Sequence, residues 1–173
     1  MKKIFIILIL SCILVINYGC SAHTTIEEGD ALLRVHIRAN GKTEQDQTVK
    51  LKVRDAVTQR LSSIMRNVQS LDTAKQIISE ERTTLQRIAN KVLMENGEDY
   101  GSRVRLTNQF FTTQTCGNTT VKSGYYDALI IDLGQGKGDN WWCIIYPTQY
   151  FSSDNSSIIY KSRIVEWLQN LFT

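Results

Sequence analysis

The sequence has 173 residues and 42% hydrophobic residues, which suits one domain with its own core. Without Lys2 and Lys3 the 20 basic residues fall to 18, against 17 acidic residues, so the charge balance gives no sign of a nucleic-acid-binding surface. Two histidines and four cysteines form no recognisable zinc pattern, and we expect neither a metal nor a cofactor.

Residues 1–22 are expected to be an export signal or an N-terminal anchor. Lys2 and Lys3 precede an apolar stretch over residues 4–16, and small residues follow it. The stretch is short for a membrane-spanning helix, but an uncleaved anchor stays open. A lipoprotein signal with Cys20 lipidated is the other alternative. Residues 23–173 are then expected to form a single globular domain.

The first predicted element is a strand within Ala31–Ala39. Apolar and polar residues alternate there with a period of two, which is typical of a strand with one buried face. The other face would be basic and carries Arg34, His36 and Arg38. This face could dock an acidic surface of a partner, or it could simply be solvated.

Two amphipathic helices are expected next, over about residues 45–67 and from Ser70–Asp72 to Gly97. Thr43 and Asp46 form an approximate capping box for the first helix. Two consecutive helices with a short link favour an antiparallel αα-hairpin. Glu81 falls on the apolar stripe of the second helix, where it either pairs with a basic neighbour or marks an exposed end. Charged residues of the first helix, among them Lys50 and Arg54, are expected at its solvated side.

Three strands and a closing helix complete the prediction. Strand composition marks residues 103–113, 125–133 and 141–146, and a short amphipathic helix is expected over residues 158–171. The glycine-rich loop before Trp141 predicts a long-looped hairpin, so the three strands would form an antiparallel meander. The expected fold is therefore α+β, with one mixed or antiparallel sheet covered by helices.

The loop at residues 134–140 contains three glycines but does not fit a phosphate-binding loop. Such a loop must open a helix, whereas this one runs into the strand-like sequence WWCIIY. Its glycines are expected to supply positive φ angles. The adjacent Trp141 and Trp142 must point to opposite faces of a strand. One is expected in the core, and the other is either a surface anchor for a partner or covered by helices on the second face.

No catalytic constellation stands out from the sequence. His36 is the only histidine of the predicted domain near structured elements, and no serine elbow accompanies it. A cysteine hydrolase that uses Cys143 and His36 stays an alternative. Cys116 and Cys143 are the two cysteines left after the signal. In an exported protein they are a disulfide candidate, or else two unpaired, mostly buried thiols.

Three separated segments carry a family resemblance. LRVHIRANGKTEQDQTVKLKVRD at Leu33–Asp55, GYYDAL at Gly124–Leu129 and GQGKGDNWWCIIYP at Gly134–Pro147 resemble, in the same order, motifs of the stage II sporulation protein R family of endospore-forming bacteria. That family usually has a tyrosine where Cys116 lies and often a cysteine where Tyr150 lies. On one interpretation, Cys143 has therefore exchanged its partner for Cys116.

The resemblance implies a non-enzymatic signalling protein that is exported from the forespore into the intermembrane space. There it would activate a membrane-embedded aspartic protease of the mother cell, stage II sporulation protein GA, which cleaves the precursor of sigma factor E. We expect membrane contact only through the N-terminal signal or a lipid anchor. The alternatives are an exported hydrolase of the septal space and a structural lipoprotein. The residues expected to contact the protease are Arg34, His36, Arg38, Arg54, Asn140, Trp141 and Trp142.

Overall fold

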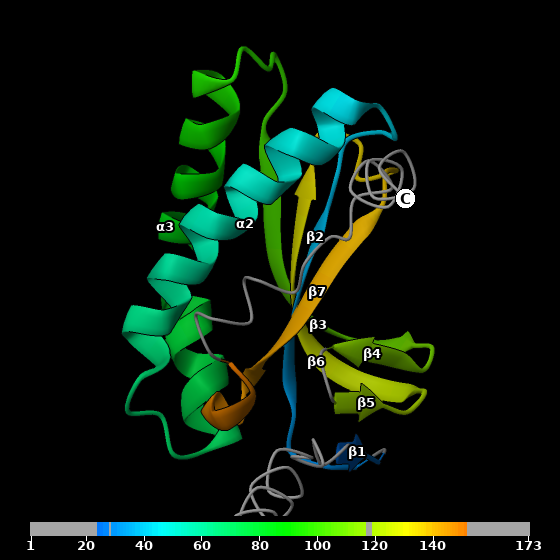
Figure 1. The fold of residues 1–173 in the computed structure, drawn as a ribbon. Helices are drawn as coiled ribbons and strands as arrows, with labels where there is room; N and C mark the ends of the chain where they lie inside the picture. Colours follow the sequence, from blue (N-terminus) through cyan, green and yellow to red (C-terminus); the bar gives the residue numbers. More distant parts are fainter. Residues whose placement is uncertain (1–23, 28, 117–118, 152–173) are drawn as a thin grey trace, which may run out of the picture.

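A computed structural model describes residues 24–27, 29–116 and 119–151 of the chain (Figure 1). The predicted export signal, the lipidation candidate Cys20 and the predicted helix at residues 158–171 lie outside these residues. Within the described part, no helix is both long enough and apolar enough to span a membrane.

The described residues form two sheets. The main sheet has four strands in the order β3-β6-β2-β7. Strand β2 runs parallel to β6 and antiparallel to β7, and β3 runs antiparallel to β6. The bounds of its strands are Leu33–Arg38 for β2, Ser102–Phe111 for β3, Gly124–Leu133 for β6 and Asn140–Tyr146 for β7.

A smaller sheet has the order β1-β5-β4, and each of its strands has three residues. The strands are β1 (Thr24–Ile26), β4 (Gln114–Cys116) and β5 (Thr119–Val121). Strand β4 pairs antiparallel with β5, and β1 pairs parallel with β5. A short 3-10 helix, η1 (Thr148–Tyr150), follows β7. The prediction of a single sheet missed this second one.

The α+β class is confirmed, but the predicted meander and the hairpin between its last two strands are wrong. Strand β2 lies between β6 and β7, so these two consecutive strands are not neighbours. Val35 pairs with Leu129 on one side and with Cys143 on the other. The burial of β2 on both faces fits this central place, because a central strand is covered on both sides.

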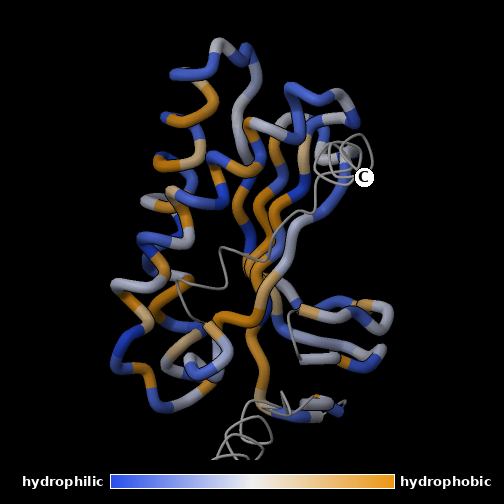
Figure 2. Tube along the Cα trace, in the orientation of Figure 1, coloured by the Kyte–Doolittle hydropathy of each residue, from blue (hydrophilic) through white to orange (hydrophobic). Residues whose placement is uncertain are grey.

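Two helices cover one face of the main sheet. Helix α2 (Glu44–Met65) lies over β2 and β7, and α3 (Leu71–Glu95) lies over β3 (Figure 1). Hydrophobic segments are concentrated in the central strands that the helices face (Figure 2). The fully buried core there includes Leu33, Val35, Ile37, Val53, Val57, Leu61, Ile78, Leu85, Leu93, Leu129 and Ile131. Burial of side chains of this size stabilises the fold by about 1.5–3 kcal/mol each.

The ends of both helices follow the sequence signals. The Thr43 side chain accepts a hydrogen bond from the Asp46 N–H, and the Asp46 carboxylate accepts one from the Thr43 N–H, which confirms the capping box. The Ser70 side chain accepts a hydrogen bond from the Thr73 N–H and so caps the start of α3. At the other end, Gly97 has a φ of +76° and Glu98 N–H donates to the Leu93 carbonyl, the pattern of a Schellman motif.

The sequence left open whether Glu81 pairs with a basic residue, and helix α2 supplies that partner. Both carboxylate oxygens of Glu81 accept hydrogen bonds from Arg60, at 2.6 Å from Nη2 and 3.0 Å from Nε. The carboxylate therefore bridges the two helices instead of entering the core.

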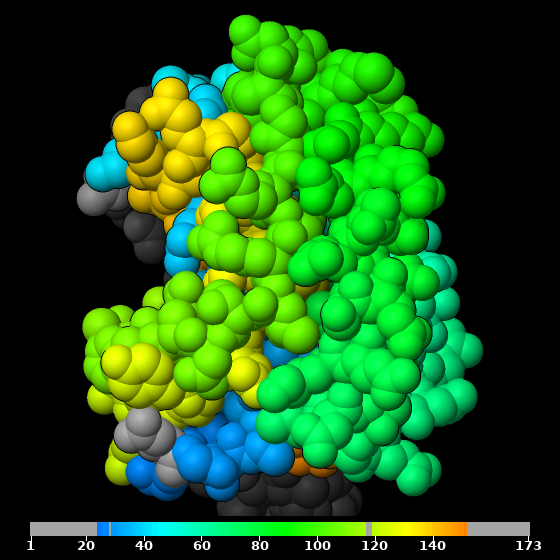
Figure 3. Space-filling model, turned by 180° about the vertical axis from the view of Figure 1, so that it is seen from behind, coloured from blue at the N-terminus to red at the C-terminus, as the bar shows by residue number. Residues whose placement is uncertain are grey.

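The opposite face of the main sheet is covered in part by the β4–β5 pair. A second apolar cluster lies there, formed by Ile26, Leu32, Phe111, Val121, Tyr126, Ala128, Ile130 and Ile144. Seen from behind, the surface has a notch between the loop that follows β6 and the β4–β5 pair (Figure 3). The helices thus cover only one face, and the predicted basic face lies partly beneath the small sheet.

Candidate functional site

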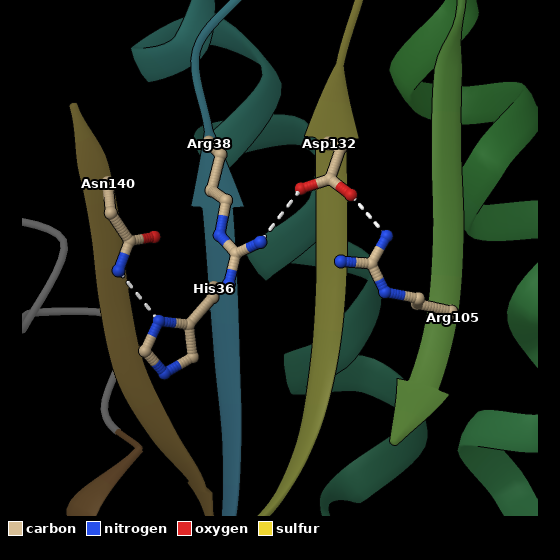
Figure 4. Close-up of polar contacts among 5 residues, drawn as sticks. All are labelled: His36, Arg38, Arg105, Asp132 and Asn140. Carbon is tan, nitrogen blue, oxygen red and sulfur yellow. Dashed lines mark hydrogen bonds and ion pairs between the residues drawn. The ribbon is translucent and has the colours of Figure 1, made fainter. Parts of the chain in front are cut away.

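The site lies on the face of the main sheet that points away from the helices. We call the residues drawn in Figure 4 the polar strip: His36 and Arg38 from β2, Asp132 from β6, Arg105 from β3, and Asn140 from β7. The strip crosses all four strands of the main sheet. It is built by the alternation of side chains along neighbouring strands, which places every second residue on this face.

Two arginines share one carboxylate in the strip. Arg38 Nη1 lies 3.5 Å from Asp132 Oδ1, and Arg105 Nη1 donates a hydrogen bond to Asp132 Oδ2 (Figure 4). The arginine side chains are 29% and 37% exposed, whereas Asp132 is 14% exposed. A guanidinium has five N–H donors, so the pair keeps more donors than one carboxylate can accept. The group carries one net positive charge at the surface.

His36 is buried and neutral. Its Nδ1 lies 2.7 Å from Asn140 Nδ2, and because an amide nitrogen only donates, Nδ1 is the acceptor. Burial lowers the pKa of His36 to about 3, and the positive charges of Arg34 and Arg38 contribute. The ring stacks on Phe111 with centroids 4.3 Å apart. The prediction of His36 on an exposed basic face is therefore wrong, because the aromatic ring of Phe111 covers it.

Arg34 is also buried, with no exposed surface. Its guanidinium carbon lies 4.3 Å from the centre of the Phe111 ring and 4.2 Å from that of Trp142, and Nη2 donates to the Gln114 side chain. Within the described part of the chain, Nε and Nη1 have no hydrogen-bond partner. Burial lowers the pKa of Arg34 to about 10, so it remains charged near neutral pH. The expectation of a solvated Arg34 is wrong because the β4–β5 pair covers it.

The two tryptophans point to opposite faces, as the alternation predicts. Trp141 is 8% exposed and belongs to the core beneath the helices, where Arg54 of α2 lies over its ring at 5.8 Å. Trp142 is half-buried on the other face, beside Arg34 and His36. The helix-covered alternative for the second tryptophan is wrong, since the small sheet and not a helix layer lies on that side, and the alternative of a surface anchor stays a prediction.

The seven residues expected to contact a partner therefore separate into two groups. Arg54 and Trp141 lie on the helix side of the sheet, whereas the other five lie on the opposite side. That second group consists of Arg34, His36, Arg38, Asn140 and Trp142.

The glycine-rich loop packs against the end of β2. Gly138 N–H donates to the Ala39 carbonyl at 2.8 Å, and Gln135 N–H donates to the Asn40 side chain at 3.0 Å. A Cβ on Gly138 would lie 1.9 Å from the Gly41 carbonyl oxygen, so only glycine fits. The φ angles of Gly134 (+55°) and Gly136 (+63°) confirm the expected left-handed positions.

Lys50 of α2 also contacts the glycine-rich loop. The lysine is fully buried, and its Nζ donates to Gln47 Oε1 at 2.6 Å and to the Asp139 carbonyl at 3.2 Å. The expectation that Lys50 is solvated is wrong, because its ammonium links α2 to the loop before β7. The loop GQGKGDN is thus held to the segment RAN by hydrogen bonds to Ala39 and Asn40, and to α2 by Lys50.

Comparison with known proteins identifies the family. Residues 29–156 match the family described as Stage II sporulation protein R (spore_II_R). The chain belongs to the stage II sporulation protein R family. It is 31% identical over 122 residues to Stage II sporulation protein R of Bacillus subtilis (strain 168), which covers 70% of this chain and 54% of the relative. The chain thus matches about half the length of that relative, and no solved structure matches it significantly.

Membership of the stage II sporulation protein R family gives the chain a role in sporulation. The segments that carried the resemblance supply three of the five residues of the polar strip, His36, Arg38 and Asn140. Strand β2 and the start of α2 come from the first segment, β6 from the second, and β7 with its preceding loop from the third. The motif residues meet because β2 lies between β6 and β7.

Sequence reasoning missed four residues of this face. Asp132 and Arg105 complete the polar strip, while Phe111 and Gln114 contact Arg34. A weak signal existed for Asp132, which is a charged residue inside the apolar run ALIIDL. Its partners come from strands far apart in the sequence, so spacing alone could not join them.

The two cysteines of the predicted domain are brought together by the fold. Cys116 Sγ lies 3.7 Å from Cys143 Sγ, and both are thiols. Cys143 is buried in the core on the helix side, and Cys116 is half-buried. Across the described ranges, no three His, Cys, Asp or Glu side chains are arranged to hold a metal ion.

Proposed function

We propose that this member of the stage II sporulation protein R family is a signalling ligand, exported from the forespore into the intermembrane space. Its partner would be the membrane-embedded aspartic protease of the mother cell, stage II sporulation protein GA, and its effect the processing of the sigma-E precursor. Family membership supports the sporulation part of the proposal. The signalling part is supported by the polar strip, which offers a contact surface.

The observation that carries the proposal is the pair of arginines on one carboxylate. Arg38 and Arg105 come from strands on either side of β6, and both remain partly exposed. Arginine presents a planar set of donors that matches a carboxylate in two-point contact. We therefore expect the protease to present an acidic side chain to this surface.

Trp142 and Asn140 extend the contact surface along β7. Trp142 is half-buried and Asn140 is exposed. Interfaces usually depend on a few aromatic and arginine side chains, and Trp142 with the two arginines fits that composition. Arg34 and His36 take a different role from the one first expected, because they support Trp142 from beneath instead of touching the partner.

The test uses the full chain, added to membranes that carry the protease together with the sigma-E precursor. We expect Arg38→Glu/Arg105→Glu to reduce the rate of precursor cleavage at least tenfold, because it reverses the charge of the strip. The matched control is Arg82→Glu/Arg87→Glu, which makes the same change on exposed positions of α3. Equal losses in both double variants, or no loss in the first, would contradict the proposed surface.

Arg38→Glu places a second carboxylate close to that of Asp132, and the repulsion could unfold the protein. A second variant therefore separates loss of the contact from loss of the fold. Arg38→Gln/Arg105→Gln removes the charge without adding repulsion, and thermal unfolding checks that it folds. It should still weaken cleavage, and the loss should be partly recovered at higher ligand concentration. If the folded glutamine variant has full activity at every concentration, the polar strip is not required for activation of the protease.

The proposal also requires delivery across the forespore membrane through residues 1–22. Mass spectrometry of the mature N-terminus would distinguish a cleaved signal from a lipid on Cys20 and from an uncleaved anchor. A protein that stays entirely inside the forespore cytoplasm would rule out the exported-ligand mechanism.

A further inference from the structure

We propose that Cys116 and Cys143 form an intramolecular disulfide that fixes the β4–β5 pair to edge strand β7. The two Sγ atoms are in van der Waals contact at 3.7 Å, although the residues are 27 positions apart in the sequence. A disulfide has an S–S distance of about 2.05 Å, so a small movement of two side chains closes the bond. The inference depends on an oxidising location and not on the signalling role.

The path of the chain explains why a covalent link belongs here. Strand β4 follows β3, which is one edge of the main sheet, but Cys116 contacts β7 at the other edge. The β4–β5 pair therefore crosses the face of the sheet. Along the way Phe111 stacks on His36, and Gln114 accepts a hydrogen bond from Arg34. The thiol pair lies at the far end of this crossing, at edge strand β7, where Cys116 packs against the helix-side core that contains Cys143.

The crossing segment has little stability of its own. Each strand of the small sheet has three residues, and β4 pairs only with β5 within the described part of the chain. Short two- and three-stranded units are marginal in water unless they pack against other structure. A disulfide at the end of the segment would restrict its opening and keep Arg34 covered.

The environment of the two thiols gives them different roles in the oxidation. The hydrogen bond with Cys143 lowers the pKa of Cys116, although burial opposes this, and the nearby positive charge of Arg34 adds to the lowering. The pKa of Cys143 is raised, first by the hydrogen bond with Cys116 and then by burial. Cys116 is also the more accessible of the two. Cys116 is thus the attacking thiolate, and Cys143 is the thiol that completes the bond.

The oxidant is a disulfide, such as oxidised glutathione or the disulfide form of a thiol–disulfide oxidoreductase. The Cys116 thiolate attacks one sulfur of the oxidant, forms a mixed disulfide and releases the first thiolate of the oxidant. Cys143 then loses its proton and attacks Cys116 Sγ, which expels the second thiolate of the oxidant. Two protein thiols are oxidised, the disulfide of the oxidant is reduced to two thiols, and the Cys116 and Cys143 protons end on the released thiols.

The experiment uses the full chain in mild detergent with Cys12→Ser and Cys20→Ser, so that two cysteines remain. After treatment with oxidised glutathione, free thiols are alkylated and the protein is digested with trypsin. Mass spectrometry should find residues 106–122 linked to residues 138–161, and dithiothreitol should remove this link. Reduction should also lower the Tm by about 10 °C, since a bond that closes a loop of this length restricts the unfolded chain.

Two single variants make the result decisive. Cys116→Ser changes the half-buried partner and should fold, but it should lose both the linked peptide and the effect of dithiothreitol on Tm. Cys143→Ala should behave in the same way. Alkylation or glutathionylation of both cysteines without the linked peptide would overturn the proposal. A link that forms only in denaturant would overturn it as well.

Discussion

The side chains of His36 and Cys143 lie on opposite faces of the main sheet. His36 pairs with Trp142 and stacks on Phe111, whereas Cys143 pairs with Val35 and belongs to the core beneath the helices. A thiol–imidazole couple would need both groups on one face and within hydrogen-bond reach. The hydrolase alternative therefore finds no support in the positions of the residues that it requires.

The first prediction follows from this separation. Cys143→Ala should leave the rate of sigma-E precursor cleavage within about twofold of the parent, because activation of the protease through a contact surface requires no catalysis by the Cys143 thiol. The measurement is the cleavage assay described above, at a temperature at which both proteins are folded. A complete loss of cleavage by a folded Cys143→Ala protein would favour thiol chemistry instead.

The second prediction concerns the dependence of the free energy of unfolding on pH. The pKa of His36 is about 3 in the folded protein, against an ordinary value of 6.5. Between these values the unfolded chain binds more protons, so the free energy of unfolding rises with pH and falls as the solution is acidified from about pH 6.5 towards about pH 3. The slope from this one group is at most about 1.4 kcal/mol per pH unit.

Urea unfolding at several pH values tests this expectation. His36→Gln does not titrate, and it should flatten the dependence between pH 6 and pH 4. His23→Gln, which changes the other histidine of the sequence, is the control and should retain the slope of the parent. Parallel curves for the parent and His36→Gln would show that His36 is not the group responsible.

The third prediction concerns the hydrogen bond that the buried Arg34 donates to Gln114. Gln114→Leu removes the acceptor of Nη2 and excludes water from the site, so the charged donor is left unsatisfied. We expect a loss of about 1.5–3 kcal/mol in the free energy of unfolding. Gln59→Leu, an exposed position of α2, should change it by about 0.5 kcal/mol or less.

Arg34→Met provides a second, contrasting variant. It removes the buried charge and the two guanidinium nitrogens that have no hydrogen-bond partner among the described residues, while its side chain still fills the space between Phe111 and Trp142. Replacement of a buried charge by an apolar group of similar size is often neutral or stabilising. Arg34→Met should thus cost less than Gln114→Leu. The reverse order would mean that the cation–π contacts dominate.

The fourth prediction concerns the loop before β7. Gly138→Ala would place a methyl group 1.9 Å from the Gly41 carbonyl oxygen and 2.7 Å from the Ala39 side chain. The backbone must move, and we expect a loss of about 1–3 kcal/mol in the free energy of unfolding. Gly101→Ala meets only an ordinary contact at 3.6 Å and should change the stability little. Equal urea midpoints for the two variants would contradict this account.

Local signals in the sequence predicted the helices well. The capping box at Thr43, the N-cap at Ser70 and the left-handed Gly97 depend on residues within one or two turns, and each lies where the pattern placed it. The class of fold followed from these elements and from the alternation in the strands. In these cases the interaction that fixes the structure joins neighbours in the sequence.

The arrangement of the sheet could not be predicted in the same way. The predicted meander assumed that the chain turns back between Leu133 and Asn140, so that β7 pairs with β6. In the structure, β2 occupies this place beside β6. The alternation of Arg34 and His36 with apolar residues also suggested a solvated face. Their burial depends on Phe111 and Gln114, which come from a segment about eighty residues later. A single sequence gives no sign of these long-range contacts.

The central place of β2 has a consequence for the order of folding. Leu33 pairs with Asp127 and with Tyr146, so the first strand of the main sheet finds its neighbours only near the end of the described chain. Contacts of such long range have a high loop-closure cost and slow the folding reaction. While a ribosome is still making the second half of the chain, β2 is present but neither of its neighbours in the sheet is. Assembly of the main sheet must therefore wait until β7 has been made.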